Sequence, residues 1–128
     1  MDIANTVNAA QLAYFGDVVL EKLIRRCIVL SGNTRPSEAS LAYVTAPAQS
    51  EALERILPLL TEEEEAVFRR GRNSVHGNVP KHATVAQYRR ATGLETLFGY
   101  LDLAERVERV EELFRAAYPD LCEECIQK

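Results

Sequence analysis

The sequence predicts a single all-α domain, and three observations lead to this prediction. Apolar residues recur three and four positions apart, and no useful stretch alternates apolar and polar residues as a half-buried strand would. A threonine followed three residues later by Glu or Gln opens two helical stretches, which is the capping-box pattern of a helix N-terminus. The length of 128 residues and the hydrophobic fraction of 47% suit one domain, residues 1–128, with a packed core.

The first half of the chain is expected to form a long helix followed by two shorter ones. The long helix covers about residues 7–30 and ends before Gly32, which can adopt the left-handed conformation of a helix C-cap. Ser37 is the expected cap of the next helix. Pro47 should divide that helix, because proline lacks a backbone donor and clashes with the preceding turn. The two expected segments are about 37–45 and 47–59.

The second half of the chain is expected to form three further helices. Thr61 caps the first, which runs to about Arg72 and carries four consecutive glutamates, 62–65, at the positive end of its dipole. Thr84 caps the second, which runs through the apolar stretch from Tyr88 to Leu103. The last helix is amphipathic. Its expected inward residues are Val107, Val110, Leu113 and Phe114.

Charge is distributed unevenly along the chain. The net charge of −4 and the pI of about 5.2 argue against a nucleic-acid-binding protein when the whole chain is considered. Residues 69–90, in contrast, contain six basic residues, both histidines and no acidic residue, whereas the rest of the chain has nine basic and 19 acidic residues. Such a patch can bind a polyanion locally, and the alternative is that it pairs with the protein's own acids. Its loop, about 73–83, is long for a compact domain and is therefore a candidate functional segment.

The cysteine pattern and the lack of a recognisable secretory signal predict an intracellular protein. Cys27, Cys122 and Cys125 are an odd number without the spacing of a disulfide framework, and no second cysteine pair completes a structural zinc site. The last two lie in residues 118–128, which we expect to form a tail. The sequence shows no secretory signal and no apolar run long enough to cross a bilayer. We expect a cytoplasmic protein with reduced thiols, or an organellar one if the source is a plant.

Two carboxylates lie within apolar helical stretches that are far apart in the sequence. Asp17 follows Gly16 in the stretch LAYFGDVVLE. Glu95 lies beside an apolar face made by Leu94, Leu97, Phe98 and Leu101. An isolated carboxylate in such surroundings loses hydration, and either an arginine or a bound metal ion would compensate it. We expect the two acids to share a site, and the structural alternative for Glu95 is an arginine partner or an exposed helix edge.

Glu21 lies one helical turn after Asp17 and projects from the same side of the helix. An ion pair with Arg25, a further turn along, is the structural alternative to a functional role for Glu21.

Two helix-borne carboxylates and a basic loop suit metal-assisted hydrolysis of a phosphodiester. Carboxylate oxygens hold Mg²⁺, the ion lowers the pKa of a bound water and offsets charge in the transition state, and basic residues position neighbouring phosphates. Two alternatives belong to other classes of protein. One is a non-catalytic RNA-binding or ribosome-assembly module on the same scaffold, and the other is a helical protein-interaction module that uses the acidic last helix.

Three segments of the chain, in order, resemble the ribonuclease III family. LAYFGDVVLE resembles the family's signature helix, in which a Gly-Asp pair follows an apolar stretch, and ATGLETLFGYL resembles its second acidic motif. The segment between them, FRRGRNSVHGNVPKHATVAQYRR, is most similar to the Mini-ribonuclease III branch, which has the nuclease domain without a separate double-stranded-RNA-binding domain. The resemblance extends from about Leu12 to Leu113 and implies the helical bundle of the ribonuclease III endonuclease domain.

The resemblance also implies the roles of individual residues. Asp17 and Glu95 match the family's catalytic and metal-binding acids, with Mg²⁺ as the expected ion and Mn²⁺ as a substitute. Glu21 is expected to lie just behind these ligands. Full-length ribonuclease III has further acids where this chain has Ala10, Ala13 and Thr92, and the Mini branch also lacks them. The residues implicated in RNA contact are Arg69, Arg70, Arg72, Asn73, Lys81, Tyr88 and Arg89.

The family is a symmetric homodimer whose signature helices pack about the two-fold axis, which implies a homodimer here. The candidate contact residues are Ala10, Ala13, Tyr14 and Phe15. A symmetric interface would place two active sites on one face, one for each strand of an RNA duplex read by its shape. The family's products carry a 5′-phosphate and a 3′-hydroxyl, and the bacterial Mini branch matures precursors of 23S ribosomal RNA. The implied partners are therefore that precursor and, in addition, a ribosomal protein.

Overall fold

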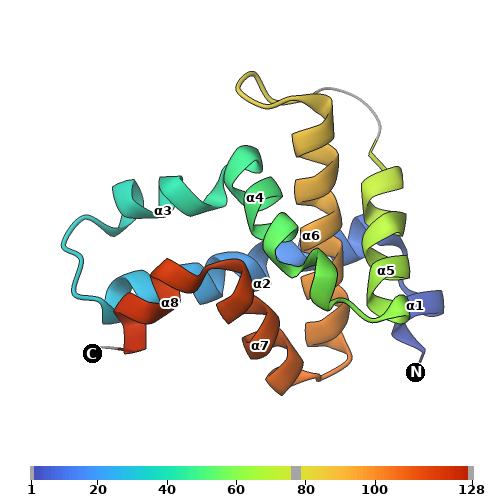
Figure 1. Cartoon of the computed structure of the whole chain (residues 1–128). Coiled ribbons are helices and arrows are strands. Elements are labelled where there is room, and N and C mark those ends of the chain that lie inside the picture. The colour runs from blue at the N-terminus through green and yellow to red at the C-terminus, as the bar shows by residue number, and fades with distance from the viewer. Residues whose placement is uncertain (1, 76–78, 127–128) are drawn as a thin grey trace.

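The computed structural model describes residues 2–75 and 79–126, and all the regular structure in this part of the chain is helical, which confirms the all-α prediction. Figure 1 shows the arrangement of the helices. In chain order they are α1 (Ile3–Thr6), α2 (Ala9–Leu30), α3 (Pro36–Val44), α4 (Ala46–Ile56), the 3-10 helix η1 (Leu57–Leu59), α5 (Glu62–Asn73), α6 (Val85–Leu103), α7 (Val107–Ala117) and α8 (Pro119–Ile126). Within the described residues, no helix is long and apolar enough to span a membrane.

Helix α6 lies at the centre of the bundle and packs against α2, α4 and α5 (Figure 1). The four residues predicted to face the core, Leu94, Leu97, Phe98 and Leu101, have no exposed surface, so this prediction is confirmed. Burial of each such side chain contributes about 1.5–3 kcal/mol to the stability of the fold. The other helices add fully buried residues to the same core, including Leu12, Leu20 and Ile24, Leu53 and Ile56, and Leu113.

Capping boxes mark the starts of three helices, α2, α5 and α6. The capping boxes predicted at Thr61 and Thr84 are both present: each threonine hydroxyl accepts a hydrogen bond from the backbone nitrogen three residues later, at 3.2 and 3.0 Å. A third box, formed by Asn8 and Gln11, was not anticipated and starts α2 at Ala9 instead of residue 7. Gly32 has a φ of 82° after the end of α2, as expected of a C-cap glycine.

The structure corrects the predicted start of the second helix and confirms its division. Helix α3 begins at Pro36, and Ser37 lies inside its first turn instead of capping it, because proline at the first helical position already has the required φ. Thr45 separates α3 from α4 and caps α4, and its hydroxyl accepts a hydrogen bond from the Ala48 nitrogen at 3.4 Å. Pro47 is tolerated within the first turn of α4, where no intrahelical donor is needed.

Two expectations for the end of the chain were wrong. Residues 118–128 are not a tail, because they contain α8, from which Leu121 and Cys122 are buried against the core. Cys125 lies in α8, but its side chain is outside the described part of the structure. Val107 was expected to face inward and is 62% exposed, because it is the first residue of α7 and adjoins the exposed turn after α6.

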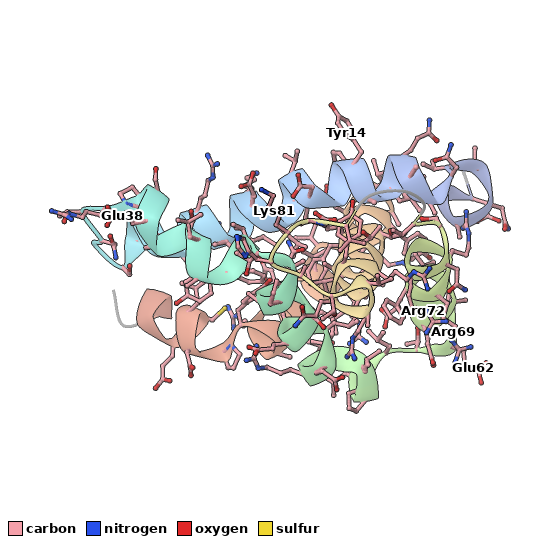
Figure 2. All side chains as sticks on the ribbon, turned by 90° about the horizontal axis from the view of Figure 1, so that it is seen from above. Tyr14, Glu38, Glu62, Arg69, Arg72 and Lys81 are labelled. Atoms are coloured by element: carbon pink, nitrogen blue, oxygen red, sulfur yellow. The ribbon has the colours of Figure 1, made fainter. Side chains whose placement is uncertain are left out.

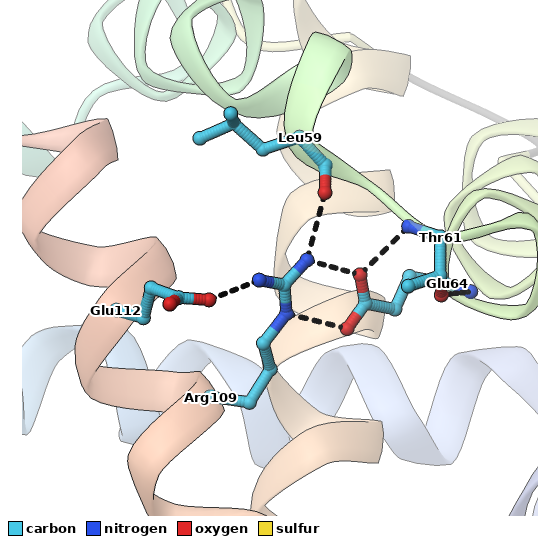
Figure 3. Close-up of polar contacts among 5 residues, drawn as sticks. All are labelled: Leu59, Thr61, Glu64, Arg109 and Glu112. Atoms are coloured by element: carbon cyan, nitrogen blue, oxygen red, sulfur yellow. Dashed lines mark hydrogen bonds and ion pairs between the residues drawn. The ribbon is translucent and has the colours of Figure 1, made fainter.

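A buried ion pair fixes the start of α5 against α7 (Figure 3). The Glu64 carboxylate, 2% exposed, accepts hydrogen bonds from Arg109 Nε at 2.8 Å and Nη2 at 2.7 Å, and from the Thr61 nitrogen at 2.9 Å. Arg109 also donates to the Leu59 carbonyl at 2.8 Å and to Glu112. Of the four glutamates expected to complement the helix dipole, Glu64 therefore has a second role in tertiary packing.

Candidate active site

Helices α2 and α6 cross with their backbones in contact, and glycine makes this contact possible. A Cβ atom on Gly16 would overlap the Glu95 carbonyl and lie 2.9 Å from the Gly99 nitrogen. A Cβ atom on Gly99 would overlap the Leu12 carbonyl and lie 3.0 Å from the Gly16 nitrogen. Gly16 contacts Glu95 and Gly99 contacts Leu12, so α2 and α6 run antiparallel at the crossing. The residue after Gly16 is thus held beside the turn of α6 that carries Glu95.

Asp17 and Glu95 lie against each other at this crossing, close enough for Asp17 to act on the Glu95 carboxyl by hydrogen bonding and by charge. Burial, this hydrogen bonding and the negative charges of Asp17 and Glu21 together raise the pKa of Glu95 to about 9. Within the described part of the chain, neither acid has an ion pair with an arginine or a lysine. Asp17 is exposed and Glu95 is half-buried, so the pair opens to solvent on the α2 side. The structure therefore brings together the two acids selected from the sequence.

The chemistry of this pair fits a divalent cation. Two acids this close in a partly dehydrated site can both be ionised only at a cost in free energy, so Glu95 keeps its proton toward Asp17 unless a cation between them offsets the second charge. Oxygen ligands of this kind are those that Mg²⁺ and similar hard ions take, and Mg²⁺ commonly binds through one or two carboxylates and several waters. Among the described residues, no three His, Cys, Asp or Glu side chains are arranged to hold an ion directly. Asp17 and Glu95 would therefore be the ligands from the protein.

Glu21 lies beside this pair and also has the partner foreseen for it. The distance from Arg25 Nη2 to Glu21 Oε1 is 3.4 Å, so the expected ion pair is present. The charge of Glu21 nevertheless reaches Glu95, because it is one of the charges that raise the Glu95 pKa. The ion pair and the proximity to the carboxylates are therefore compatible.

A basic groove of about 400 Å³ lies between α5 and α6. Its arginines come from both helices and include three of the predicted RNA-contact residues, Arg69, Arg72 and Arg89, together with Arg90, which the sequence reading did not select. The Arg72 guanidinium carbon lies 5.6 Å from the centroid of the Phe68 ring, which is a cation–π contact within the groove. In Figure 2 the Arg69 and Arg72 side chains lie on the α5 side of the molecule, while Lys81 comes from the loop before α6.

Internal pairing accounts for part of this basic segment. Arg69 Nη2 lies 2.6 Å from Glu65 Oε1, and Arg90 pairs with Glu54. The Arg69–Glu65 pair is exposed and contributes about 0–1 kcal/mol, whereas the Arg90 side chain is only 28% exposed. Arg89 and Lys81 are exposed and, in the part of the chain that is described, have no ion pair. The alternative of internal pairing thus holds for two of the arginines.

The structure separates Arg70 from the rest of the predicted RNA-contact set. Its guanidinium turns toward α1, where it donates to the Ala4 carbonyl and, at 3.4 Å, to the Val7 carbonyl. Consecutive residues on a helix project about 100° apart, so Arg70 cannot share the face of Arg69. This spacing was visible in the sequence, and a contact between Arg70 and RNA stays a prediction.

Two other predicted contact residues, Asn73 and Tyr88, are next in sequence to arginines of the groove but do not line it. Asn73 ends α5 and its side chain accepts a hydrogen bond from Arg72 Nε at 3.1 Å. Tyr88 is half-buried in the first turns of α6, and its carbonyl accepts a hydrogen bond from the Thr92 hydroxyl at 3.0 Å. The loop from 73 to 83 is described except for residues 76–78, so His76 is outside the described residues.

The outer face of α2 carries the candidate dimer contacts. Tyr14 is 81% exposed and points away from the body of the molecule in Figure 2. Ala10 is exposed as well, whereas Ala13 is half-buried and Phe15 packs partly against the core. Val18, one turn after Tyr14, is 57% exposed and was not selected from the sequence, although its spacing of four from Tyr14 would have identified it.

Comparison with known proteins agrees with this geometry. The model of the ribonuclease III domain matches residues 10–106. The chain is 41% identical to Mini-ribonuclease 3 of Symbiobacterium thermophilum, over 91% of this chain and 94% of the relative. It is 43% identical to Mini-ribonuclease 3 of Enterococcus faecalis, over 84% and 85% of the two chains. A crystal structure of a Fusobacterium nucleatum protein is 26% identical, covers 90% of this chain and 94% of its own, and superposes with a TM-score of 0.82.

The extent of these matches settles the family. The matched domain contains both carboxylates, the basic groove and the α2–α6 crossing. Enzymes of this family act on RNA, generally use divalent metal ions and are generally dimeric. The chain therefore belongs to the ribonuclease III family, in its Mini-ribonuclease 3 branch, and is an endoribonuclease of the ribonuclease III type.

Proposed function

We propose that this enzyme cleaves double-stranded or structured RNA in a Mg²⁺-dependent reaction, with Asp17 and Glu95 as its metal-binding and catalytic residues. The meeting of these two side chains at the α2–α6 crossing carries the proposal. We further propose that Mn²⁺ can replace Mg²⁺, that the products carry a 5′-phosphate and a 3′-hydroxyl, and that the RNA is a precursor of 23S ribosomal RNA in the cytoplasm. A ribosomal protein on that precursor is the protein partner that such a substrate implies.

The residues of the site divide the work of hydrolysis between them. When bound, the divalent ion supplies positive charge against the reacting phosphate and lowers the pKa of a water molecule. Asp17 and Glu95 hold that ion, and the apolar surroundings of Glu95 limit the water that competes for its oxygens. The crossing at Gly16 and Gly99 keeps the carboxylates in place before the ion arrives, so that little reorganisation is needed.

The arginine groove supplies the contacts to the RNA backbone. Arg69, Arg72 and Arg89 line this groove and would contact phosphates, and Lys81, Asn73 and Tyr88 would add contacts from the loop and from the helix ends beside it. Such contacts position a duplex without reading its bases. Arg70, which holds α1 in the structure, would act on the RNA only indirectly.

We propose that two copies of the chain pack through the outer face of α2. Tyr14 and Val18 present apolar surface there, and a groove of about 620 Å³ continues along α2 past Val18 to Val29. A symmetric contact through this helix would place both Asp17–Glu95 pairs on the same side of the dimer. Each pair would then face one strand of the duplex.

The decisive experiment combines cleavage and end mapping. Purified protein is incubated with duplex RNA, with Mg²⁺ or with EDTA, and the product ends are mapped. Cleavage should require the ion, leave 5′-phosphates and disappear in Asp17→Asn and in Glu95→Gln, while both variants retain duplex binding. Cleavage that survives both substitutions would remove these residues from the mechanism, and salt-sensitive binding without cleavage in the unaltered protein would favour the non-catalytic RNA-binding alternative.

A further inference from the structure

Glu21 is the third carboxylate at the α2–α6 crossing. It follows Asp17 by four residues, so both side chains project from the same side of α2, one turn apart. The Glu21 side chain is 38% exposed and therefore lies at the boundary between the site and solvent. This position differs from that of the exposed Glu38 on α3, whose side chain is 72% exposed.

The direction of the helices brings Glu21 toward the pair. Side chains on a helix lean toward its N-terminus, so Glu21 leans back toward Asp17. On α6, Glu95 leans toward the preceding turn, and the opposed course of the two helices places that turn beside the Glu21 end of the crossing. The Glu21 charge acts on Glu95, which agrees with this placement.

The partner of Glu21 leaves it free to act on the site. Arg25 Nη2 approaches only Oε1 of Glu21, at 3.4 Å, and the Arg25 side chain is 69% exposed. A long, exposed contact of this kind contributes little free energy and leaves the second carboxylate oxygen available to a water molecule. Arg25 therefore holds Glu21 only weakly, through one of its two carboxylate oxygens.

We propose that Glu21 is a positioning residue for the cation site: it accepts a hydrogen bond from a water molecule bound to the ion that Asp17 and Glu95 hold. The inference rests on the proposed Mg²⁺ dependence. A role through water agrees with the absence of three directly converging ligands among the described residues. It also suits Mg²⁺, which retains several of its waters in protein sites.

The role predicts how Glu21 affects ion binding. Groups that hold the ligands or waters of a metal typically change its affinity by roughly 10–100-fold when they are removed. Glu21→Gln loses the charge but keeps an acceptor, and Glu21→Ala loses both, so Glu21→Ala should have the larger effect. At saturating ion, the maximal rate of cleavage should recover in both variants, because Asp17 and Glu95 remain in place.

The test measures Mg²⁺ and Mn²⁺ binding to the full chain without RNA, by isothermal titration calorimetry. Asp17→Asn provides the reference for loss of a direct ligand, and Glu38→Gln is the matched control, since Glu38 also pairs with an arginine but lies on α3. Arg25→Gln removes the partner of Glu21 while it keeps the carboxylate, and should leave ion affinity unchanged or tighter. Circular dichroism and thermal unfolding of each metal-free variant check that it folds.

The outcomes separate this inference from the proposed function. Wild-type affinity in both Glu21 variants, with cleavage still dependent on Mg²⁺, would overturn the role of Glu21 alone. A loss of ion affinity as complete as that in Asp17→Asn, with no recovery of cleavage at high ion concentration, would make Glu21 a direct ligand and would overturn the water-mediated role. An unaltered protein that binds neither ion would overturn both the inference and the proposed Mg²⁺ dependence.

Discussion

Two glutamates of this protein lie in similar helical surroundings and have opposite electrostatic states. Glu64, at the start of α5, is buried, and burial alone would raise its pKa, but hydrogen bonds and charge from Arg109 and hydrogen bonds from Thr61 lower it overall. Glu95, in the middle of α6, has no such compensation, and burial together with Asp17 and Glu21 raises its pKa to about 9. Figure 3 shows the partners that make this difference at Glu64.

The comparison distinguishes a structural carboxylate from a functional one. At Glu64 the protein supplies the cation itself, so the charge is satisfied in the folded state and ties two helices together. At Glu95 the protein brings a second acid instead, and the cation that we propose for this site would offset the free energy that this costs. A pair of isosteric substitutions should therefore separate the two roles.

The largest expected difference is between Glu95→Gln and Glu64→Gln. Glu95→Gln should lower the cleavage rate by roughly 10³-fold, because several kcal/mol of transition-state stabilisation depend on the ion. Near neutral pH its metal-free stability should equal that of the wild type, because Glu95 with a pKa of about 9 is already uncharged there, and above that pKa the variant should be the more stable. Glu64→Gln should keep cleavage at temperatures where it is folded and lose about 1.5–3 kcal/mol of stability.

Single-turnover cleavage of duplex RNA measures the cleavage rate of each variant, and urea unfolding in EDTA measures its metal-free stability. If Glu95→Gln were the less stable variant and Glu64→Gln the less active one, the distinction between the two sites would be wrong.

Removal of the internal cation should have the next largest effect. Arg109→Met leaves Glu64 buried with an uncompensated charge and should reduce the free energy of unfolding by about 3–5 kcal/mol. Arg35→Met is the control, because the Arg35 side chain is 78% exposed in its pair with Glu38 and should change stability by less than about 1 kcal/mol. Urea unfolding followed by circular dichroism measures both, and equal effects would show that the buried pair contributes no more than a surface pair.

The close approach of α2 and α6 gives a third test. Gly99→Ala places a methyl group against the Leu12 carbonyl, so the helices must separate, at a cost of about 1–3 kcal/mol. Because the same contact holds Asp17 beside Glu95, ion affinity should fall as well. Gly71→Ala is the control: its Cβ would overlap Thr96 at the α5–α6 contact, so stability should fall with unchanged ion affinity. Equal ion affinity in both variants would contradict the positioning role of the crossing.

The last test is a pH dependence of opposite sign at the two glutamates. The folded-state pKa of Glu95, about 9, lies above its ordinary value of 4.5. Between these two pH values the folded metal-free protein binds more protons than the unfolded chain, so its stability falls as the pH rises from 4.5 to about 9. The folded-state pKa of Glu64 lies below 4.5, so its contribution is present above that value and is lost on further acidification.

Thermal unfolding from pH 5 to 9 in EDTA should therefore show a decline that Glu95→Gln removes and that Mg²⁺ reduces. A decline of the same slope in Glu95→Gln would assign the effect to another group.

Much of the fold was accessible from the sequence because its signals are local. Capping boxes at Thr61 and Thr84 depend on four consecutive residues, and the inward face of α6 depends on helical spacing. The local signal was also present where the prediction failed, because Tyr118, Leu121, Cys122, Cys125 and Ile126 recur at helical intervals. Only the fold shows what that face packs against, since Leu121 and Cys122 of α8 are buried against the core.

The candidate site also divides into residues that local sequence signals identified and residues whose surroundings only the fold determines. Asp17 and Glu95 were selected as carboxylates in apolar stretches, and the family resemblance added their roles. By contrast, the assignment of Arg70 to the RNA surface followed its neighbours in sequence, whereas its guanidinium contacts carbonyls at the start of the chain. The extra groove residue Arg90 and the exposed Val18 belong to surfaces that only the assembled helices define.

By itself, the sequence determined the all-α class, the helix starts at the threonine caps and the identity of the two acids, because each of these depends on residues within a few turns of one another. Only the tertiary structure decided which carboxylate is neutralised from within and which is left for a cation. That outcome depends on the partner that packing delivers: Arg109 reaches Glu64 from another helix, while two glycines let α2 bring Asp17 against Glu95.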